Sequence, residues 1–289
     1  MKMPPGKEST PRVGFIGQGY IGKNYADDFE RRGFEVVCYA LEEPYVQNKE
    51  KIKECDIVFI AVPTPTTLEG FDDSIVREAI GLVGEGKVVI VKSTIVPGTT
   101  KSFQVHYPDR IIFYSPEFLS EATAAQDAAH PFSNILGSAT DDEMHRIAAE
   151  QIHAILPQSS FSLTCDSTEA ELIKYAHNVN GFMQVVLWNI FYDLTLKSGG
   201  DWSVVQKALA ADPYVSDKYL APVHKTGRGA GGHCFIKDFA ALRSLYEQRV
   251  GDAHGIAALS AIEKKNISLL KESRKDLDLL RGVYGPDIA

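Results

Sequence analysis

The sequence predicts an α/β fold, a doubly wound parallel sheet, followed by an all-helical domain. From Arg12 to about Leu163, short runs of β-branched and aromatic residues alternate with helical patterns. This alternation is typical of βαβ units that build a parallel sheet. After Cys165 the β-rich runs stop and long helical patterns follow. The predicted organisation is a loose tail at 1–11, a sheet domain at 12–165 and a helical domain at 166–289.

The predicted strands are short apolar runs, and the clearest helical patterns between them are Asp72–Glu85 and Asp141–Leu156. The strands are Val13–Ile16, Glu35–Tyr39, Ile57–Ala61, Lys87–Lys92, Ile111–Tyr114, Ser133–Gly137 and Ser159–Leu163.

The second half begins with a long helical pattern that runs to about Lys197. Thr168 followed by Glu171 predicts a capping box at its start. The helix is apolar on several sides, so we expect one face to pack against a second subunit in a homodimer. A loop is predicted over 212–232. The remaining predicted helices are Val204–Ala211, Asp238–Arg249 and Ile256–Asp276.

Composition excludes several classes of function. The chain has 289 residues with 44% apolar content, enough for two domains with buried cores. Its net charge of −8 and the absence of a Lys/Arg cluster argue against a nucleic-acid partner. The strongest apolar run, Ile57 to Val62, is too short to span a membrane, and residues 1–11 do not resemble a signal peptide. Four scattered cysteines without a CxxC pair fit a reducing compartment, the cytoplasm, and predict no metal site.

A glycine-rich turn directly follows the first predicted strand. Gly17, Gly19 and Gly22 form a GxGxxG motif that opens a helical pattern. The glycines permit a tight turn and a close approach to a pyrophosphate, and the helix N-terminus offers backbone N–H groups. The motif alone is weak evidence, but its strand–turn–helix context predicts a Rossmann-like domain that binds a dinucleotide through this turn, including Tyr20 and Ile21.

The end of the second strand bears on the choice of cofactor. An acid that binds the adenosine ribose is expected there, but Ala40 occupies the position. Glu42 or Glu43 is the alternative source of a carboxylate. No arginine is present to accept a 2′-phosphate, so NAD is favoured over NADP.

Cys234 is the candidate nucleophile. It follows Gly231 and Gly232, which allow close backbone approach, and it precedes Lys237, a cation that could favour the thiolate, and Asp238, an acid that could handle a proton. Beside a nicotinamide site, a thiol can trap an aldehyde as a thiohemiacetal and allow a second oxidation. The alternatives are a buried structural cysteine and a dyad with His233.

With these motifs in family order, the chain resembles the UDP-glucose/GDP-mannose dehydrogenase family. The resemblance runs from residue 12 to about 270, and it has three departures. The stretch before Asp56 is short, Ala40 replaces an acid, and the family's third, nucleotide-sugar-binding domain is not found after Gly282. The matching segments are Gly17–Gly22, Val62–Pro65, Lys92–Thr99, Pro116–Glu121, Ala170–Asn178 and Gly231–Asp238.

The resemblance implies a role for each site residue. Cys234 would form the thiohemiacetal and the thioester, and Lys174 and Asn178 would stabilise an oxyanion. Thr94, Glu121 and Asp238 would hold a water for proton transfer and hydrolysis. The cofactor would contact Thr64, Ser93, Thr94 and Glu121, and the substrate would contact Glu117, Phe118, Leu119, Lys174, Asn178 and Gly231.

Each role has a structural alternative in the residues themselves. Lys174 and Asn178 are also compatible with a solvated helix face, and Thr94 with the end of a strand. Glu121 is compatible with the start of a helix, and Asp238 with an N-cap. Lys225 and Arg228 fit either an anionic substrate or a solvated loop equally well.

The resemblance therefore predicts NAD-dependent oxidation of a nucleotide sugar such as UDP-glucose to the carboxylate. One alternative is a two-electron dehydrogenase of a smaller sugar or hydroxy acid. The other is a catalytically silent cofactor-binding protein.

Overall fold

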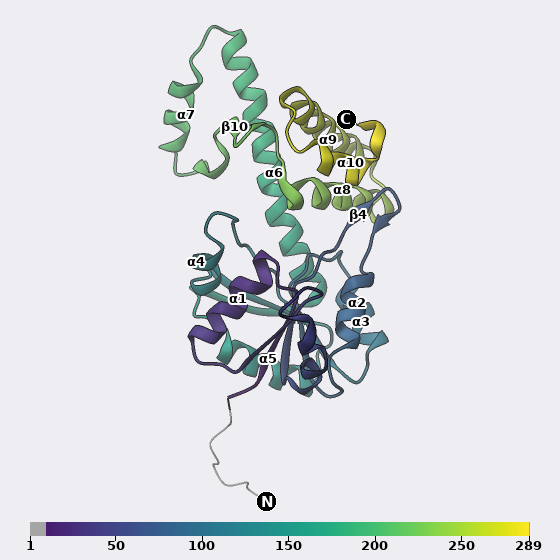
Figure 1. The fold of residues 1–289 in the computed structure, drawn as a ribbon. Coiled ribbons are helices and arrows are strands. Elements are labelled where there is room, and N and C mark those ends of the chain that lie inside the picture. The colour runs from purple at the N-terminus through teal and green to yellow at the C-terminus, as the bar shows by residue number, and fades with distance from the viewer. Residues whose placement is uncertain (1–9, 289) are drawn as a thin grey trace, which may run out of the picture. The chain divides into compact units, whose positions relative to one another are not determined.

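The computed structural model describes residues 10–288, and it divides into two compact units (Figure 1). The first unit comprises Met1–Thr64 and Asp73–Lys174, and the second comprises Pro65–Asp72 and Tyr175–Ala289. The boundary expected after residue 165 falls within strand β9, whereas the units divide within the following helix. Of the tail expected at 1–11, residues 1–9 lie outside the described residues.

A seven-stranded sheet forms the centre of the first unit, in the order β2-β1-β3-β6-β7-β8-β9. All neighbouring strands are parallel except β7 and β8, which pair antiparallel. The last strand begins two residues later than the sequence predicted. The strands are β1 Val13–Ile16, β2 Val36–Tyr39, β3 Ile57–Ile60, β6 Val88–Val91, β7 Ile111–Tyr114, β8 Ser133–Ser138 and β9 Phe161–Asp166.

Helices cover both faces of this sheet, as expected for a doubly wound domain (Figure 1). One face packs on α1, α4 and α5 through a cluster in which the Phe15 ring stacks on Phe59, 4.9 Å between centroids. The central strands β3 and β6 are buried along their whole length, which explains their continuous apolar sequence. The helices are α1 Tyr20–Arg31, η1 Val46–Glu54, α2 Ser74–Gly81, α3 Thr99–His106, α4 Ala124–Ala129 and α5 Glu143–Ile155.

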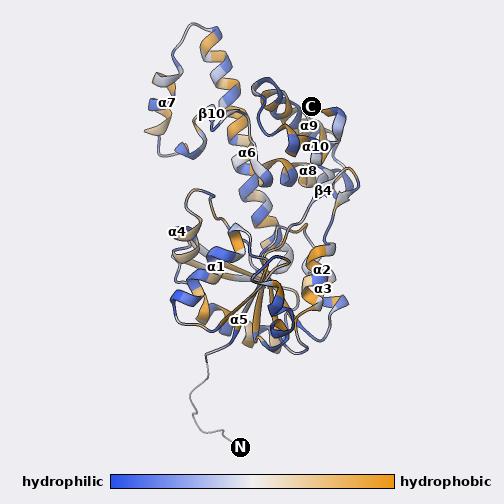
Figure 2. Cartoon of the chain, in the orientation of Figure 1, coloured by the Kyte–Doolittle hydropathy of each residue, from blue (hydrophilic) through white to orange (hydrophobic). Residues whose placement is uncertain are grey.

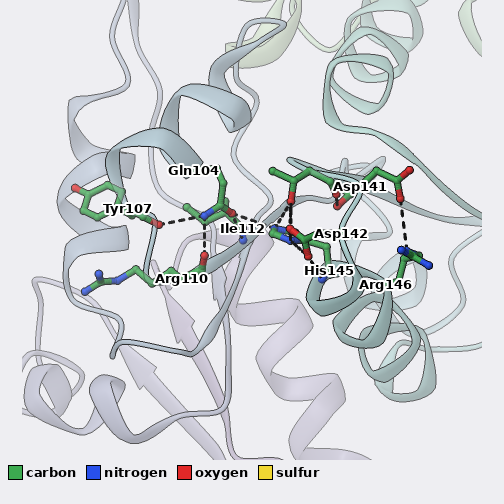
Figure 3. A network of polar contacts seen from close by, with 10 residues as sticks. Gln104, Tyr107, Arg110, Ile112, Asp141, Asp142, His145 and Arg146 are labelled. Carbon is green, nitrogen blue, oxygen red and sulfur yellow. Dashed lines mark hydrogen bonds and ion pairs between the residues drawn. The ribbon is translucent and has the colours of Figure 1, made fainter.

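A buried histidine ties three of these elements together (Figure 3). His145, in the first turn of α5, lies 3.1 Å from the side-chain oxygen of Gln104 on α3 and 2.9 Å from Asp142. Gln104 also accepts from the backbone N–H of Ile112 in β7. Hydrogen bonds from the His145 backbone and from Thr140 lower the pKa of Asp142, the N-cap of α5. Every polar atom of this histidine is therefore used for structure.

The long helix α6, Ser167–Lys197, begins one residue before the capping box that the sequence predicted. The box is formed instead by Asp166 and Glu169. Asp166 accepts from the N–H of Thr168, and Glu169 accepts from the N–H of Asp166. The prediction from Thr168 and Glu171 was wrong because Asp166 accepts from the Thr168 N–H, while Glu171 accepts from the N–H groups of Gly98 and Thr100 instead.

The second unit is mainly helical, but it also contains two short antiparallel hairpins. The hairpin over residues 223–228 lies within 166–289, so the prediction of an all-helical domain there was wrong. One helix starts six residues earlier than predicted, at Gly232. The last predicted helix, Ile256–Asp276, begins and ends three residues earlier than expected, and the helix Leu277–Tyr284 was not predicted. Besides α6 from Tyr175, the elements are β4 Thr66–Thr67, β5 Gly70–Phe71, α7 Trp202–Ala210, η2 Asp217–Tyr219, β10 Val223–His224, β11 Gly227–Arg228, α8 Gly232–Arg249, α9 Ala253–Ser273, α10 Leu277–Tyr284 and η3 Pro286–Ile288.

Helix α8 packs on three other helices in this unit. Phe239 stacks on Phe182 of α6 with the ring centroids 4.0 Å apart. Ile236 packs with Leu270 of α9 and Leu280 of α10. The N-terminal end of α8, which carries Cys234, is thus anchored by apolar contacts on two sides. No helix within residues 10–288 is both long and apolar enough to cross a membrane.

Candidate active site

The glycine-rich turn between β1 and α1 requires its glycines. Gly17 has a φ of +92°, and a Cβ there would lie 2.3 Å from the Ala61 carbonyl oxygen. A Cβ at Gly22 would lie 1.9 Å from the Gly17 carbonyl oxygen. No side chain fits at either position, so the tight turn that precedes α1 depends on both residues.

The N-terminus of α1 is suited to bind an anion. Its N-cap is Gly19, which has no side chain to occupy the first N–H groups, and its first turn contains no acid. A Cβ at Gly19 would meet no atom within 4 Å, so open space lies above the helix end. Tyr20 is 41% exposed beside it, while Ile21 packs against the core. These features fit a pyrophosphate held by backbone N–H groups and the helix dipole.

The carboxyl ends of β3 and β6 are joined by hydroxyl groups. Ser93 donates to the Val62 carbonyl at 2.7 Å and accepts from the Val62 N–H at 2.9 Å. The Thr64 hydroxyl donates to the carbonyl oxygen of Thr94 at 2.8 Å. Ser93, Thr64 and Thr94 are all buried at the sheet edge where open α/β sheets bind ligands.

The end of β2 has no acid at the ribose position. Tyr39 pairs in register with Ile16, so Ala40 is the residue that follows the strand beside the glycine turn. Its neighbour Leu41 is exposed, and so are Glu42 and Glu43. Neither glutamate occupies the position that Ala40 takes.

A buried ion pair lies in the loop after β7. The Lys174 ammonium is 2.9 Å from the Glu117 carboxylate, and both side chains are almost fully buried. The second carboxylate oxygen accepts from the N–H of Leu119, and the ammonium lies over the Phe118 ring, 5.5 Å from its centroid. Four of the predicted substrate residues are thus brought together here. Glu121, farther along the loop, is exposed, and it precedes α4 by three residues rather than starting it.

Two buried residues of this unit make contacts that the sequence did not predict. Lys92, at the end of β6, lies 3.2 Å from the Ser115 hydroxyl and over the Tyr25 ring, and burial lowers its pKa to about 8. Glu171 accepts from the N–H of Thr100 at 2.8 Å and so caps α3, and burial raises its pKa. The sequence did contain a signal for each residue. Lys92 is a charged residue at the end of a fully apolar strand, and Glu171 is a charged residue on the buried face of a helix.

The second group of candidate residues is built around α8. Cys234 is the third residue of this helix, in the first turn, where unpaired N–H groups and the helix dipole favour an anion. Asp238, one turn later and 1% exposed, accepts from Asn178 at 2.6 Å and from Lys237 at 2.7 Å. Asp238 is therefore not an N-cap. Its carboxylate is a buried acceptor that holds Asn178.

Lys225 and Arg228, the two cations of the loop before Cys234, lie in different surroundings. Lys225 is exposed, whereas Arg228 is partly buried and its guanidinium binds Asp193 at 2.6 Å and Asn189 at 2.8 Å on α6. Lys225 adopts a φ of +55° in the turn of the β10–β11 hairpin. Gly231 is the N-cap of α8.

Protein-family comparisons agree with this geometry. Residues 43–156 match the NAD binding domain of the UDP-glucose/GDP-mannose dehydrogenase family, and residues 168–266 match the central domain of the same family. The chain belongs to this family.

Curated relatives carry the same family name over much of the chain. UDP-glucose 6-dehydrogenase AglM of Haloferax volcanii is 28% identical, with 92% of this chain and 73% of the relative covered. UDP-glucose 6-dehydrogenase of Rickettsia conorii is 30% identical, with 76% of this chain and 51% of the relative covered. The chain thus spans about half the length of some of the curated relatives it matches.

A solved structure confirms the fold. A UDP-glucose dehydrogenase from Pyrobaculum islandicum superposes with a TM-score of 0.76 at 24% identity, and the match covers 94% of this family member and 73% of that chain. The prediction of a Rossmann-like sheet domain followed by helices is therefore confirmed.

Proposed function

We propose that this chain is an NAD-dependent dehydrogenase that oxidises the primary alcohol of a nucleotide sugar, such as UDP-glucose, to the carboxylate. One observation carries the proposal. Cys234 lies in the first turn of α8, one turn before a buried carboxylate, Asp238, that is bonded to Asn178. A thiol in this position is suited to act as a covalent nucleophile.

The residues of the first unit support cofactor binding. The N-terminus of α1 and the glycines at 17, 19 and 22 would hold the pyrophosphate, with Thr64, Ser93 and Thr94 at the strand ends beneath the dinucleotide. NAD, when bound, supplies the hydride acceptor.

The side chains then carry out the covalent steps. A base takes the hydroxyl proton as the first hydride leaves the alcohol carbon, which gives an aldehyde. The Cys234 thiolate adds to the aldehyde carbon, and the resulting oxyanion takes up a proton as a thiohemiacetal. Loss of a second hydride and of the hydroxyl proton would then give a thioester. Water then cleaves the carbon–sulfur bond and releases the acid and the thiol.

Five polar side chains would assist these steps. Lys174 and Asn178 lie four residues apart on α6 and would donate to the oxyanion. Asp238, whose carboxylate is buried, would accept the proton from the attacking water, together with Thr94 and Glu121. The nucleotide sugar would contact Glu117, Phe118, Leu119 and Gly231.

NADH stoichiometry tests the proposal. With limiting UDP-glucose, the chain should form two NADH per sugar, and Cys234→Ser should abolish formation of the acid. Cys165→Ser is the matched control, because burial raises the pKa of Cys165 to about 11 and makes its thiolate scarce. One NADH per substrate would indicate a two-electron dehydrogenase. NAD binding without turnover of any sugar would indicate a silent binding protein.

We also propose that the chain forms a homodimer through α6. The C-terminal half of this helix carries apolar residues, coloured orange in Figure 2, and four of them form an exposed stripe at helical spacing. The stripe consists of Leu187, Ile190, Phe191 and Leu194. A surface of this kind fits a second copy of the same helix. Light scattering should give twice the mass of one chain, and Leu194→Asp should give the mass of a single chain.

The proposed location is the cytoplasm. All four cysteines are thiols rather than disulfides, as in a reducing compartment. Localisation of a tagged chain by cell fractionation tests this proposal.

A further inference from the structure

We infer that Asn266, Lys275 and Asp276 are positioning residues for Cys234. They hold the backbone of the segment Gly227–Gly232, here called the glycine segment, which leads into the first turn of α8. The inference rests on the proposed role of Cys234 as the nucleophile. All of these residues lie in the second unit.

Asn266 pairs with the middle of the glycine segment. Its side-chain oxygen accepts from the Ala230 N–H at 2.7 Å, and its side-chain nitrogen donates to the Ala230 carbonyl at 2.9 Å. Both groups are buried, and Ala230 is 1% exposed. The amide of Asn266 thus satisfies both backbone groups of one residue, as a neighbouring β-strand would.

The turn that follows α9 supports the first half of the segment. The buried Lys275 ammonium donates to the Gly229 carbonyl at 2.9 Å and lies 3.4 Å from the Gly227 carbonyl. Ser273 accepts from the Arg228 N–H at 3.0 Å. A buried ammonium that is used on two carbonyl oxygens is costly to desolvate, so its presence here indicates a specific task.

Asp276 holds the other end of the segment, at the start of α8. Its carboxylate accepts from the Gly232 N–H at 2.8 Å, which satisfies one of the unpaired donors of the helix N-terminus. A Cβ at Gly231 would lie 2.0 Å from the same carboxylate oxygen. Asp276, from a distant part of the chain, therefore caps the helix at Gly232, two residues before the nucleophile Cys234.

The turn after α9 has a strained backbone that directs Lys275 and Asp276 toward the glycine segment. Arg274 and Asp276 both adopt left-handed backbone conformations, with φ of +54° and +53°. Each costs roughly 1–2 kcal/mol for a residue with a Cβ. Strain of this kind persists where surrounding contacts require it and is concentrated at functional sites. Here it places Lys275 and Asp276 against the glycine segment.

The test compares Asp276→Ala with Asp276→Asn. The alanine variant removes the acceptor for the Gly232 N–H, whereas asparagine retains a side-chain oxygen there. Two readouts are measured in the full chain. The first is the steady-state kinetics, kcat and the KM for NAD. The second is the rate at which iodoacetamide alkylates Cys234, which mass spectrometry of the Cys234 peptide measures. Asp252→Ala is the matched control, because Asp252 caps α9 at its other end through His254 and Gly255.

For Asp276→Ala we expect kcat and the alkylation rate each to fall by about tenfold, because small displacements of a nucleophile have large effects on rate. KM for NAD should stay unchanged, since the cofactor residues lie in the other unit. Asp276→Asn should restore most of both rates, and Asp252→Ala should resemble the unmodified chain. Equal rates in Asp276→Ala and the unmodified chain would overturn the inference, as would equal losses in Asp276→Ala and Asp252→Ala.

Two further outcomes separate this inference from the proposed function. If Asp276→Ala fails to fold in a thermal melt, Asn266→Asp carries the test. It keeps the acceptor for the Ala230 N–H, loses the donor to the Ala230 carbonyl and places a negative charge against that carbonyl. It should lower the alkylation rate, and an unchanged rate would overturn the inference. If the unmodified chain oxidises no sugar while these variants still alter Cys234 alkylation, the proposed function fails and the positioning role stands.

Discussion

The side-chain nitrogen of Asn178 lies 2.6 Å from the carboxylate of Asp238, and both groups are buried in the helical unit. The contact fixes the orientation of the Asn178 amide, because its nitrogen must face the acid. The amide oxygen then points away from Asp238.

Asp238→Asn should reduce turnover strongly while leaving the chain folded. The substitution keeps the shape of the side chain but removes the charge that accepts from Asn178 and Lys237 and, in the proposed reaction, from water. Loss of general-base catalysis typically costs about 10²–10⁴ in rate. NADH formation under saturating substrate measures kcat. Asp278→Asn, at a side chain that is 97% exposed on α10, serves as the control and should match the unmodified chain.

Gly19→Ala should weaken NAD binding without affecting the fold. A Cβ at this position meets no protein atom within 4 Å, so any loss reports on a ligand above the N-terminus of α1. We expect Kd to rise by at least about tenfold, equivalent to ~1.4 kcal/mol. Titration of the intrinsic fluorescence with NAD measures Kd. Gly282→Ala, also in open space, is the control, and an equal Kd in both variants would contradict the assignment of the cofactor site.

The Glu117–Lys174 pair should show strong coupling in a double-mutant cycle. Glu117→Gln or Lys174→Met alone leaves the partner charge buried without compensation, which typically costs about 3–5 kcal/mol in free energy of unfolding. The double variant should lose less than the sum of the two single losses. Urea unfolding measures all four proteins. Additive losses would show that the two side chains contribute independently.

Lys92 should make stability depend on pH in the alkaline range. Burial lowers its pKa in the folded chain from 10.5 to about 8. Between these values the unfolded chain binds more protons, so the free energy of unfolding should rise as pH rises from 8 to 10.5. The gain is about 3 kcal/mol at most.

Lys92→Met lacks this titration and isolates its effect. Cys38, Cys55 and Cys165 act in the opposite direction, because burial raises the pKa of each to about 11, but they are common to both proteins. The stability of Lys92→Met relative to the unmodified chain should therefore fall between pH 8 and pH 10.5. A constant difference between the two unfolding free energies would show that Lys92 has the same pKa in the folded and the unfolded chain.

Much of the sheet domain could be predicted because its signals are local. Ile57–Ile60 and Val88–Val91 are buried on both faces, so their sequences are continuously apolar and their bounds are nearly those predicted. The GxGxxG motif predicted the turn after β1 because the backbone there leaves no room for a Cβ at Gly17 or Gly22. The antiparallel pairing of β7 with β8 could not be predicted, since the direction of a strand depends on its connection and not on its composition.

The helical unit was harder to predict because its determinants are distant in sequence. The start of α8 was placed at Asp238, since Gly231 and Gly232 resemble the end of a loop, yet Asp276 caps the helix at Gly232. Arg228 was assigned to a substrate or to solvent because nothing near it in sequence indicates Asp193. The roles assigned to Cys234, Lys174 and the other site residues stay predictions until the variants are measured.

The glycine segment also sets a limit on how far this chain can be shortened by protein engineering. A version cut after Leu270 would keep every residue assigned to the chemistry and would seem complete by that criterion. It would nevertheless lack Ser273, Lys275 and Asp276. The N–H groups of Arg228 and Gly232 and the carbonyl oxygen of Gly229, all near the thiol, would then have to find water instead. The smallest workable version of the molecule is therefore defined by its last helices rather than by its reactive side chains.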